Sequence, residues 1–187
     1  MKTLRWGIVV LFTITALTAK TRAEDSPSLK QTTDWLAEKM NMFGNGEGEG
    51  RGDKAGEKIA VKIESARFDG CKLSYTIQTT WRGKSTKIKE ISTDYALVLS
   101  DLDASKVEIV TNSQVEMVAN YSIIHLETPS GALKISHKLK ARDSNPGVTH
   151  DVFSLKEAST RIPIADSTLA QQVVKAFVHA INLCKNP

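Results

Sequence analysis

One run of alternating residues constrains the fold of this chain more than any other feature. Between Cys71 and Trp81, every second side chain is apolar or aromatic, apart from one threonine, and the residues between them are polar. This period of two is typical of a β-strand with one buried and one solvated face. The members of the buried face are Cys71, Leu73, Tyr75, Ile77, Thr79 and Trp81. We therefore expect an antiparallel sheet with one apolar face.

The dipeptide Asp69-Gly70 directly before this run predicts a two-residue hairpin turn. Such a turn pairs Phe68 with Cys71 and continues into an earlier strand that contains Ile63. Strict pairing would set the apolar residues of that earlier strand against the polar face. One extra residue near Glu64-Ser65 corrects the alternation, so we predict a β-bulge there.

Further apolar or alternating runs predict more strands along the chain. They fall at residues 84–93, 95–99, 107–110, 115–119, 121–128, 133–139 and 152–155. We predict one strongly bent antiparallel sheet of about seven strands within residues 58–155, which is a usual size for a sheet.

Two amphipathic helices flank the predicted strands. The first is expected over 29–42, where Ser28 and Gln31 have the spacing of a capping box. The second is expected over 166–184, capped by Asp166 or Ser167, with an apolar stripe that would cover the sheet. The sequence thus predicts a single α+β domain over residues 24–187.

The glycine-rich segment 44–57 has no apolar periodicity. It lacks the glycine and lysine spacing of a phosphate-binding loop, and no strand precedes it. Its composition is typical of a flexible linker, which we predict here. The triplet Arg51-Gly52-Asp53 is a common combination in such a segment, and we do not interpret it as an adhesion motif.

The first 23 residues have the features of a secretory signal peptide. Lys2 and Arg5 precede an apolar run from Trp6 to Ala19, and small residues follow at Thr21-Arg22-Ala23. The apolar run is shorter than the roughly 20 residues of a membrane span. We expect cleavage before Glu24, export to the periplasm if the source is a Gram-negative bacterium, and no integral membrane segment afterwards.

Removal of the predicted signal peptide changes the charge balance. The chain has 25 Lys and Arg against 21 Asp and Glu, and four of the basic residues lie in the signal. The remainder is formally neutral, so a nucleic-acid partner is not expected. Two cysteines remain, Cys71 and Cys184. They could form one disulfide in an oxidising compartment, or stay as two buried thiols.

The sequence shows no coherent catalytic set, and we predict no cofactor and no metal site. His125 and Glu127 share one strand face, and a solvated face explains them. His137 lies on an apolar strand face, most simply as a core or rim residue. Asp101 and Asp103 are a possible carboxylate pair, but turn-forming roles explain them as well.

Three segments resemble parts of a group of exported bacterial proteins of unknown function. They are SLKQTTDWL, FDGC and AFVHAINLC, in this order after the signal. The resemblance implies an exported setting and brings no activity or site. Separately, a run of antiparallel strands closed by one C-terminal helix is similar in element order to the pleckstrin-homology-like architecture, which does not fix a function.

These observations favour an exported, non-catalytic module that binds a small molecule or a protein partner. The expected ligand groove involves Tyr75, Trp81, His137 and Phe177. One alternative is an enzyme that combines His137 or His150 with Asp101 or Asp103. Another is attachment to an anionic envelope surface by a basic hairpin that contains Arg82, Lys84, Lys87 and Lys89. The sequence indicates no oligomeric state.

Overall fold

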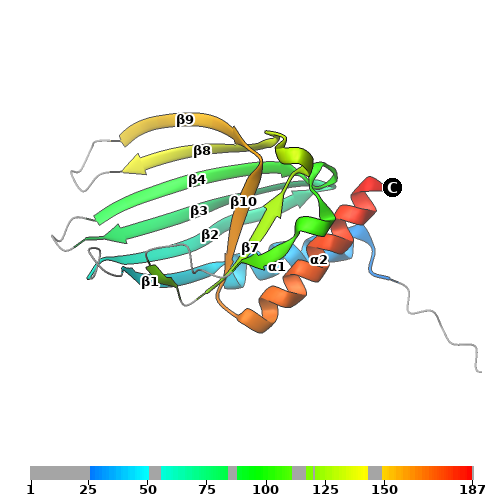
Figure 1. The fold of residues 1–187 in the computed structure, drawn as a ribbon, viewed down its shortest axis with the longest axis horizontal. Coiled ribbons are helices and arrows are strands. Elements are labelled where there is room, and N and C mark those ends of the chain that lie inside the picture. The colour runs from blue at the N-terminus through cyan, green and yellow to red at the C-terminus, as the bar shows by residue number, and fades with distance from the viewer. Residues whose placement is uncertain are drawn as a thin grey trace, which may run out of the picture.

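The computed structural model describes residues 26–50, 56–83, 88–110, 117–119, 121–142 and 149–186. Within these, side chains are described except at 50, 88–89, 117–119, 141–142 and 149–153. The predicted signal peptide lies outside the described residues. The described part is an α+β fold with one helix near each end and antiparallel strands between them (Figure 1).

A bent, seven-stranded antiparallel sheet forms the largest element of the described residues. Its central strand β3 (Lys72–Arg82) contains the alternating run, as predicted. The face that carries Leu73 and Tyr75 is here named the inner face, and the opposite face, with Ser74 and Thr76, the outer face. The spatial order is β6 (Met117–Ala119), β1 (Asn45–Gly50), β2 (Lys58–Asp69), β3, β4 (Ile88–Val98), β8 (Ile135–Arg142) and β9 (Thr149–Glu157).

A second, three-stranded sheet crosses the inner face of the large sheet (Figure 1). It contains β10 (Ser159–Ile164), β7 (Ser122–Glu127) and β5 (Glu108–Val110), in this order. The predicted strand region ended at residue 155, and that boundary was wrong. Strand β10 was not predicted because it contains Pro163, and proline lacks the N–H that a strand donates to its neighbour. It fits here because β10 is an edge strand of the small sheet as described.

Both predicted helices are present and their caps are confirmed. Helix α1 (Leu29–Phe43) begins with the capping box, in which the Ser28 hydroxyl accepts from the Gln31 N–H at 3.2 Å. Helix α2 (Ser167–Lys185) is capped by Asp166, whose carboxylate accepts from the Leu169 N–H at 2.8 Å. Helix α1 packs on β2, and α2 packs on α1 and on the small sheet.

Among the residues that the structure describes, three short 3₁₀ turns connect the strands around the crossing. They are η2 (Leu99–Asp101), η3 (Ala104–Lys106) and η5 (Pro129–Gly131). The hydrophobic core lies between the large sheet, the small sheet and the two helices. Its fully buried members include Leu36, Met40, Ile63, Leu73, Ile124, Leu126, Ile162, Ile164, Val173, Phe177 and Ile181.

The prediction of a flexible linker over 44–57 was wrong for its first half. Residues Asn45–Gly50 form strand β1, which pairs with β2 on one side and β6 on the other. Gly46 must lack a side chain at this position, because a Cβ there would lie 2.1 Å from the Tyr121 ring. Residues 51–55 of the segment lie outside the described residues.

The hairpin between β2 and β3 is confirmed, but its turn lies one residue later than predicted, and Phe68 pairs two residues further along the chain. Asp69 pairs with Lys72 and Phe68 with Leu73, so Gly70 and Cys71 form the turn. Gly70 has a φ of +55°, which glycine adopts without strain. The predicted β-bulge is present between Glu64 and Arg67, where Ser65 has a φ of +58°.

A disulfide joins Cys71 in this turn to Cys184 near the end of α2. Their Cα atoms are 5.8 Å apart, an ordinary distance for a disulfide, and the cysteines are 113 residues apart in sequence. Of the two alternatives left by the sequence, the structure therefore shows the bridge. It holds the last turn of α2 against one end of the large sheet.

We expect the double variant Cys71→Ser/Cys184→Ser to lose about 2–4 kcal/mol of unfolding free energy in urea denaturation. The chain-entropy argument gives roughly 4–5 kcal/mol for so long a loop, and measured losses are usually smaller. Wild-type protein under reducing conditions is the matched comparison and should show a similar loss. Equal midpoints for oxidised wild type and the double variant would contradict a stabilising bridge.

Candidate functional site

A cavity of about 480 Å³ lies beside the corner where β9 turns into β10. Tyr95, Leu133 and the segment 156–161 form its walls. Its volume is within the range of small-molecule sites in proteins. We name it the corner cavity.

Three aromatic side chains from neighbouring strands meet next to this cavity. Tyr75 of β3, Tyr95 of β4 and His137 of β8 are directly opposite one another in the sheet register, so they share the inner face. The Tyr75 and Tyr95 rings are stacked with centroids 5.0 Å apart, and the His137 ring lies 5.8 Å from Tyr95. Tyr95 is the member of this row that reaches the corner cavity.

The hydroxyl of Tyr75 makes a hydrogen bond of 2.6 Å with the hydroxyl of Thr160. Both residues are buried, and Thr160 belongs to β10, so this bond fixes the small sheet on the inner face. Burial raises the pKa of the Tyr75 phenol well above its usual range. Burial, and the charge of Glu157, also raise the pKa of Tyr95.

His137 and Glu157 form the polar part of the site. Nδ1 of His137 lies 3.5 Å from Oε1 of Glu157, within ion-pair range. This nitrogen is buried and has no hydrogen bond from a described residue. The His137 side chain is 8% exposed, whereas that of Glu157 is 48% exposed. The carboxylate is therefore accessible from the cavity, while the imidazole lies behind it.

Two exposed leucines flank Glu157. Leu133 in the cavity wall is 63% exposed, and Leu155 is 54% exposed. Leu155 pairs with His137 and Glu157 pairs with Ile135, so both side chains are on the inner side of the edge strand β9. An accessible acid thus lies between accessible apolar groups.

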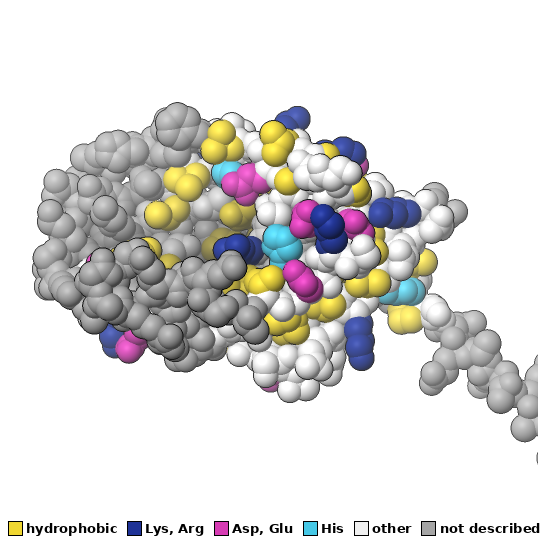
Figure 2. All heavy atoms as spheres, in the orientation of Figure 1, with side chains coloured by type: hydrophobic (Ala, Val, Ile, Leu, Met, Phe, Trp, Pro, Cys, Tyr) yellow, Lys and Arg dark blue, Asp and Glu magenta, His cyan; other side chains and the backbone are white. Residues whose placement is uncertain are grey.

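The inner face continues beyond this row as an apolar surface that is half-buried. We name it the inner strip, and Figure 2 shows hydrophobic side chains in this part of the large sheet. Adjacent strands contribute directly opposed residues to it, for example Ile59 to Trp81 and Thr79 to Ile91. Its members are Ile59, Val61, Ile77, Thr79, Trp81, Ile91 and Leu139.

The structure places the four predicted groove residues in three different environments. Tyr75 and His137 belong to the aromatic row, and Trp81 lies further along in the inner strip. Phe177 has no exposed surface and is packed in the core. Tyr95 and Glu157 were missed, because their proximity depends on the register of β4, β8 and β9. Tyr95 alternates with Thr93 and Leu97, and that alternation was the available signal.

The aspartates considered for an enzyme site lie elsewhere. Asp101 accepts a 2.6 Å hydrogen bond from Lys134, and Asp103 caps η3 through the Ser105 N–H and hydroxyl. The described partner of His137 is Glu157 instead. The His150 side chain lies outside the described part. Of the basic hairpin, only Arg82 has a described side chain, and it is exposed on the outer face.

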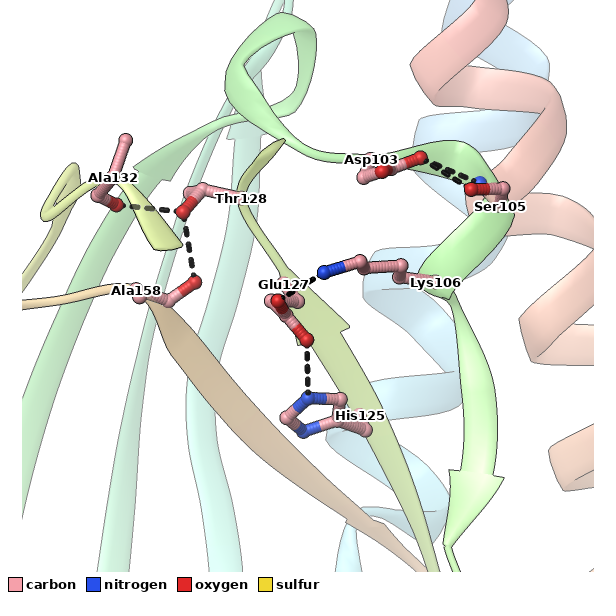
Figure 3. Close-up of polar contacts among 8 residues, drawn as sticks. All are labelled: Asp103, Ser105, Lys106, His125, Glu127, Thr128, Ala132 and Ala158. Carbon is pink, nitrogen blue, oxygen red and sulfur yellow. Dashed lines mark hydrogen bonds and ion pairs between the residues drawn. The ribbon is translucent and has the colours of Figure 1, made fainter. Parts of the chain in front are cut away.

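His125 and Glu127 form a second polar group, on the side of the small sheet that faces away from the large one (Figure 3). Glu127 accepts a hydrogen bond from Lys106 of η3 and lies 3.5 Å from Nε2 of His125. The bond from Lys106, and the one from His125, lower the pKa of Glu127. The pair was expected to be a solvated face, but His125 is only 17% exposed. We interpret the group as a structural contact that holds η3 against β7.

Thr128, directly after β7, holds the corner that forms the cavity wall. Its hydroxyl oxygen lies 2.6 Å from the carbonyl oxygen of Ala132 and 3.0 Å from that of Ala158, so its one proton is shared between them (Figure 3). Its N–H also donates to Ala158 at 2.8 Å. Because Ala158 connects β9 to β10, this fully buried threonine fixes the turn between the two sheets.

Comparisons of the chain with protein-family models, with curated proteins and with solved structures found no match. Among the described residues, no cluster of three or more His, Cys, Asp or Glu side chains could hold a metal ion. None of the described helices has the length and hydropathy that a membrane span requires.

We expect Tyr75→Phe to lower the unfolding free energy by about 1–2 kcal/mol, because it leaves the buried Thr160 hydroxyl without its partner. Thr160→Val should cost a similar amount. The double variant should cost less than the sum, since both partners are then absent. Urea denaturation of the four proteins measures this coupling, and additive losses would contradict a stabilising bond.

The tyrosine pKa values also predict a loss of stability at alkaline pH. Unfolded tyrosines release their protons near pH 10, whereas Tyr75 and Tyr95 remain protonated in the fold. Their contribution is complete below about pH 10 and falls as the pH rises above it. Urea midpoints between pH 8 and 11 should fall less steeply for Tyr75→Phe than for wild type. Trp81→Phe, which removes a non-titrating ring, should keep the wild-type slope.

Proposed function

We propose that this protein is an exported, non-catalytic binding module that holds a small apolar or amphipathic molecule on the inner face of the large sheet. The observation that carries the proposal is the inner strip, an apolar surface that the described helices and strands leave half-buried. Tyr95 connects this strip to the corner cavity. It lines the cavity, and it is followed on the inner face of β4 by Thr93 and then by Ile91 of the strip.

The partial burial of the strip favours a small ligand over a flat protein partner. Each of its members is partly covered by its surroundings, so a broad surface would reach little of it. Apolar burial contributes roughly 25 cal/mol per Å², so a ligand that buries about 300 Å² gains about 7 kcal/mol before the cost of association. Because association costs about 4 kcal/mol or more, roughly millimolar affinity is expected for a simple apolar probe.

The polar groups of the site favour binding over catalysis. The Thr160 hydroxyl is engaged by Tyr75, and Nδ1 of His137 is buried behind Glu157. Neither group is placed to exchange a proton with a ligand in the cavity. The Cys71–Cys184 disulfide supports an exported, oxidising location, as does the predicted signal peptide.

Two adjacent threonines offer a matched test. Thr79 and Thr80 are both half-buried, and their side chains lie on the inner and outer faces of β3 respectively. We expect Thr79→Trp to fill the strip and weaken binding of the neutral apolar dye N-phenyl-1-naphthylamine by about tenfold or more, a cost of about 1.4 kcal/mol. Thr80→Trp should leave binding unchanged. Fluorescence titration measures both affinities.

Urea denaturation of both variants shows whether each remains folded. Equal binding by wild type and Thr79→Trp, with both proteins folded, would contradict the proposed location. Loss of binding in Thr80→Trp alone would place the ligand on the outer face. Failure of folded wild-type protein to bind the dye would contradict the proposed function itself.

A further inference from the structure

We propose that the ligand is an amphipathic amine, whose protonated nitrogen pairs with Glu157 in the corner cavity while its apolar part lies along the inner strip. This inference rests on the proposed function and names the class of ligand that the site would select. It is carried by the geometry around one accessible carboxylate.

Glu157 is the only acidic side chain among the described residues that line the corner cavity. It is on the inner side of β9, as its register with Ile135 and its approach to His137 both show. Half of the side chain is exposed, and no described residue donates a hydrogen bond to the carboxylate. A ligand ammonium can supply up to three such bonds, each assisted by charge.

The two basic residues in the cavity wall have side chains directed to other faces. Lys156 alternates with Leu155 and Glu157 along β9, so its side chain belongs to the outer face of the large sheet. Arg161 is directly opposite His125, so it lies on the side of the small sheet that faces away from the large one. Figure 2 shows basic, acidic and histidine side chains close together on that side.

The surroundings of Glu157 suit a ligand with one charge and an apolar body. Exposed Leu133 and Leu155 flank the carboxylate, and Tyr95, which stacks on Tyr75, lines the same cavity. The negative charge acts on the cavity, because Glu157 contributes to the raised pKa of Tyr95. His137 behind the carboxylate limits its position, and we assign it a positioning role.

Three probes with the same ten-carbon chain test the inference. Decylamine is protonated at pH 7.5, decanoate is ionised, and decanol is neutral, by the ordinary pKa values of amines and carboxylic acids. Each competes with N-phenyl-1-naphthylamine in a fluorescence displacement assay. We expect decylamine to bind about two- to fivefold more tightly than decanol, as one half-exposed ion pair allows, and decanoate to bind most weakly.

The variant Glu157→Gln should bring decylamine to the affinity of decanol and leave the decanol affinity unchanged. Glu90→Gln, at an exposed outer-face position of β4, is the matched control and should retain the preference for the amine. Salt should weaken the binding of decylamine to wild type and not to Glu157→Gln.

Equal affinities for the three probes would overturn the proposal, as would a preference for decylamine that survives Glu157→Gln. Tightest binding of decanoate would also overturn it, and Lys156→Gln and Arg161→Gln would then identify the anion site. If neither wild type nor any variant binds the dye, the proposed function is contradicted, and so is this inference. If the dye binds normally while the amine shows no preference, only this inference fails.

Discussion

One buried hydrogen bond, between Tyr75 and Thr160, joins the small sheet to the inner face of the large sheet. The chain leaves the large sheet at Ala158 and crosses its inner face, which brings the polar backbone of β10 over an apolar surface. Two hydroxyls that are both buried satisfy each other at the crossing, and Thr128 holds the corner from the other side. The corner cavity exists because these bonds fix where β9 ends and where β10 begins.

The crossing divides the inner face into two parts with different roles. On the side of the helices, Leu36 and Met40 of α1 and Phe177 of α2 complete a dry core, and this part contributes stability. On the other side the apolar surface is only half covered, and it meets a half-exposed carboxylate at the aromatic row. The dry core and the proposed binding surface therefore occupy the same face of the same strands, on opposite sides of the small sheet.

Local signals predicted the elements of this fold well, and long-range pairing limited the prediction of the site. The alternation of β3, the capping box at Ser28, the Asp166 cap and the bulge at Ser65 each follow from residues close in sequence, and all are confirmed. Strand β1 was not predicted because glycine occupies every second position, and β10 was not predicted because it contains Pro163. Tyr75 and His137 were identified as candidates, but Tyr95 and Glu157 join them only through the register of strands far apart in sequence. Phe177 was predicted as a groove residue, but it lies in the core, because the apolar stripe of α2 faces the interior.

The bond between Cys71 and Cys184 closes a covalent ring that includes β3, the small sheet and most of α2. Helix α1 and strands β1 and β2 lie outside this ring. A single cut by a protease at any peptide bond within the ring leaves both fragments attached to each other. Their re-pairing is then an intramolecular event at a high effective concentration, and it does not depend on the amount of protein. A nicked molecule can thus keep its fold in a compartment where proteases are common, as long as that compartment remains oxidising.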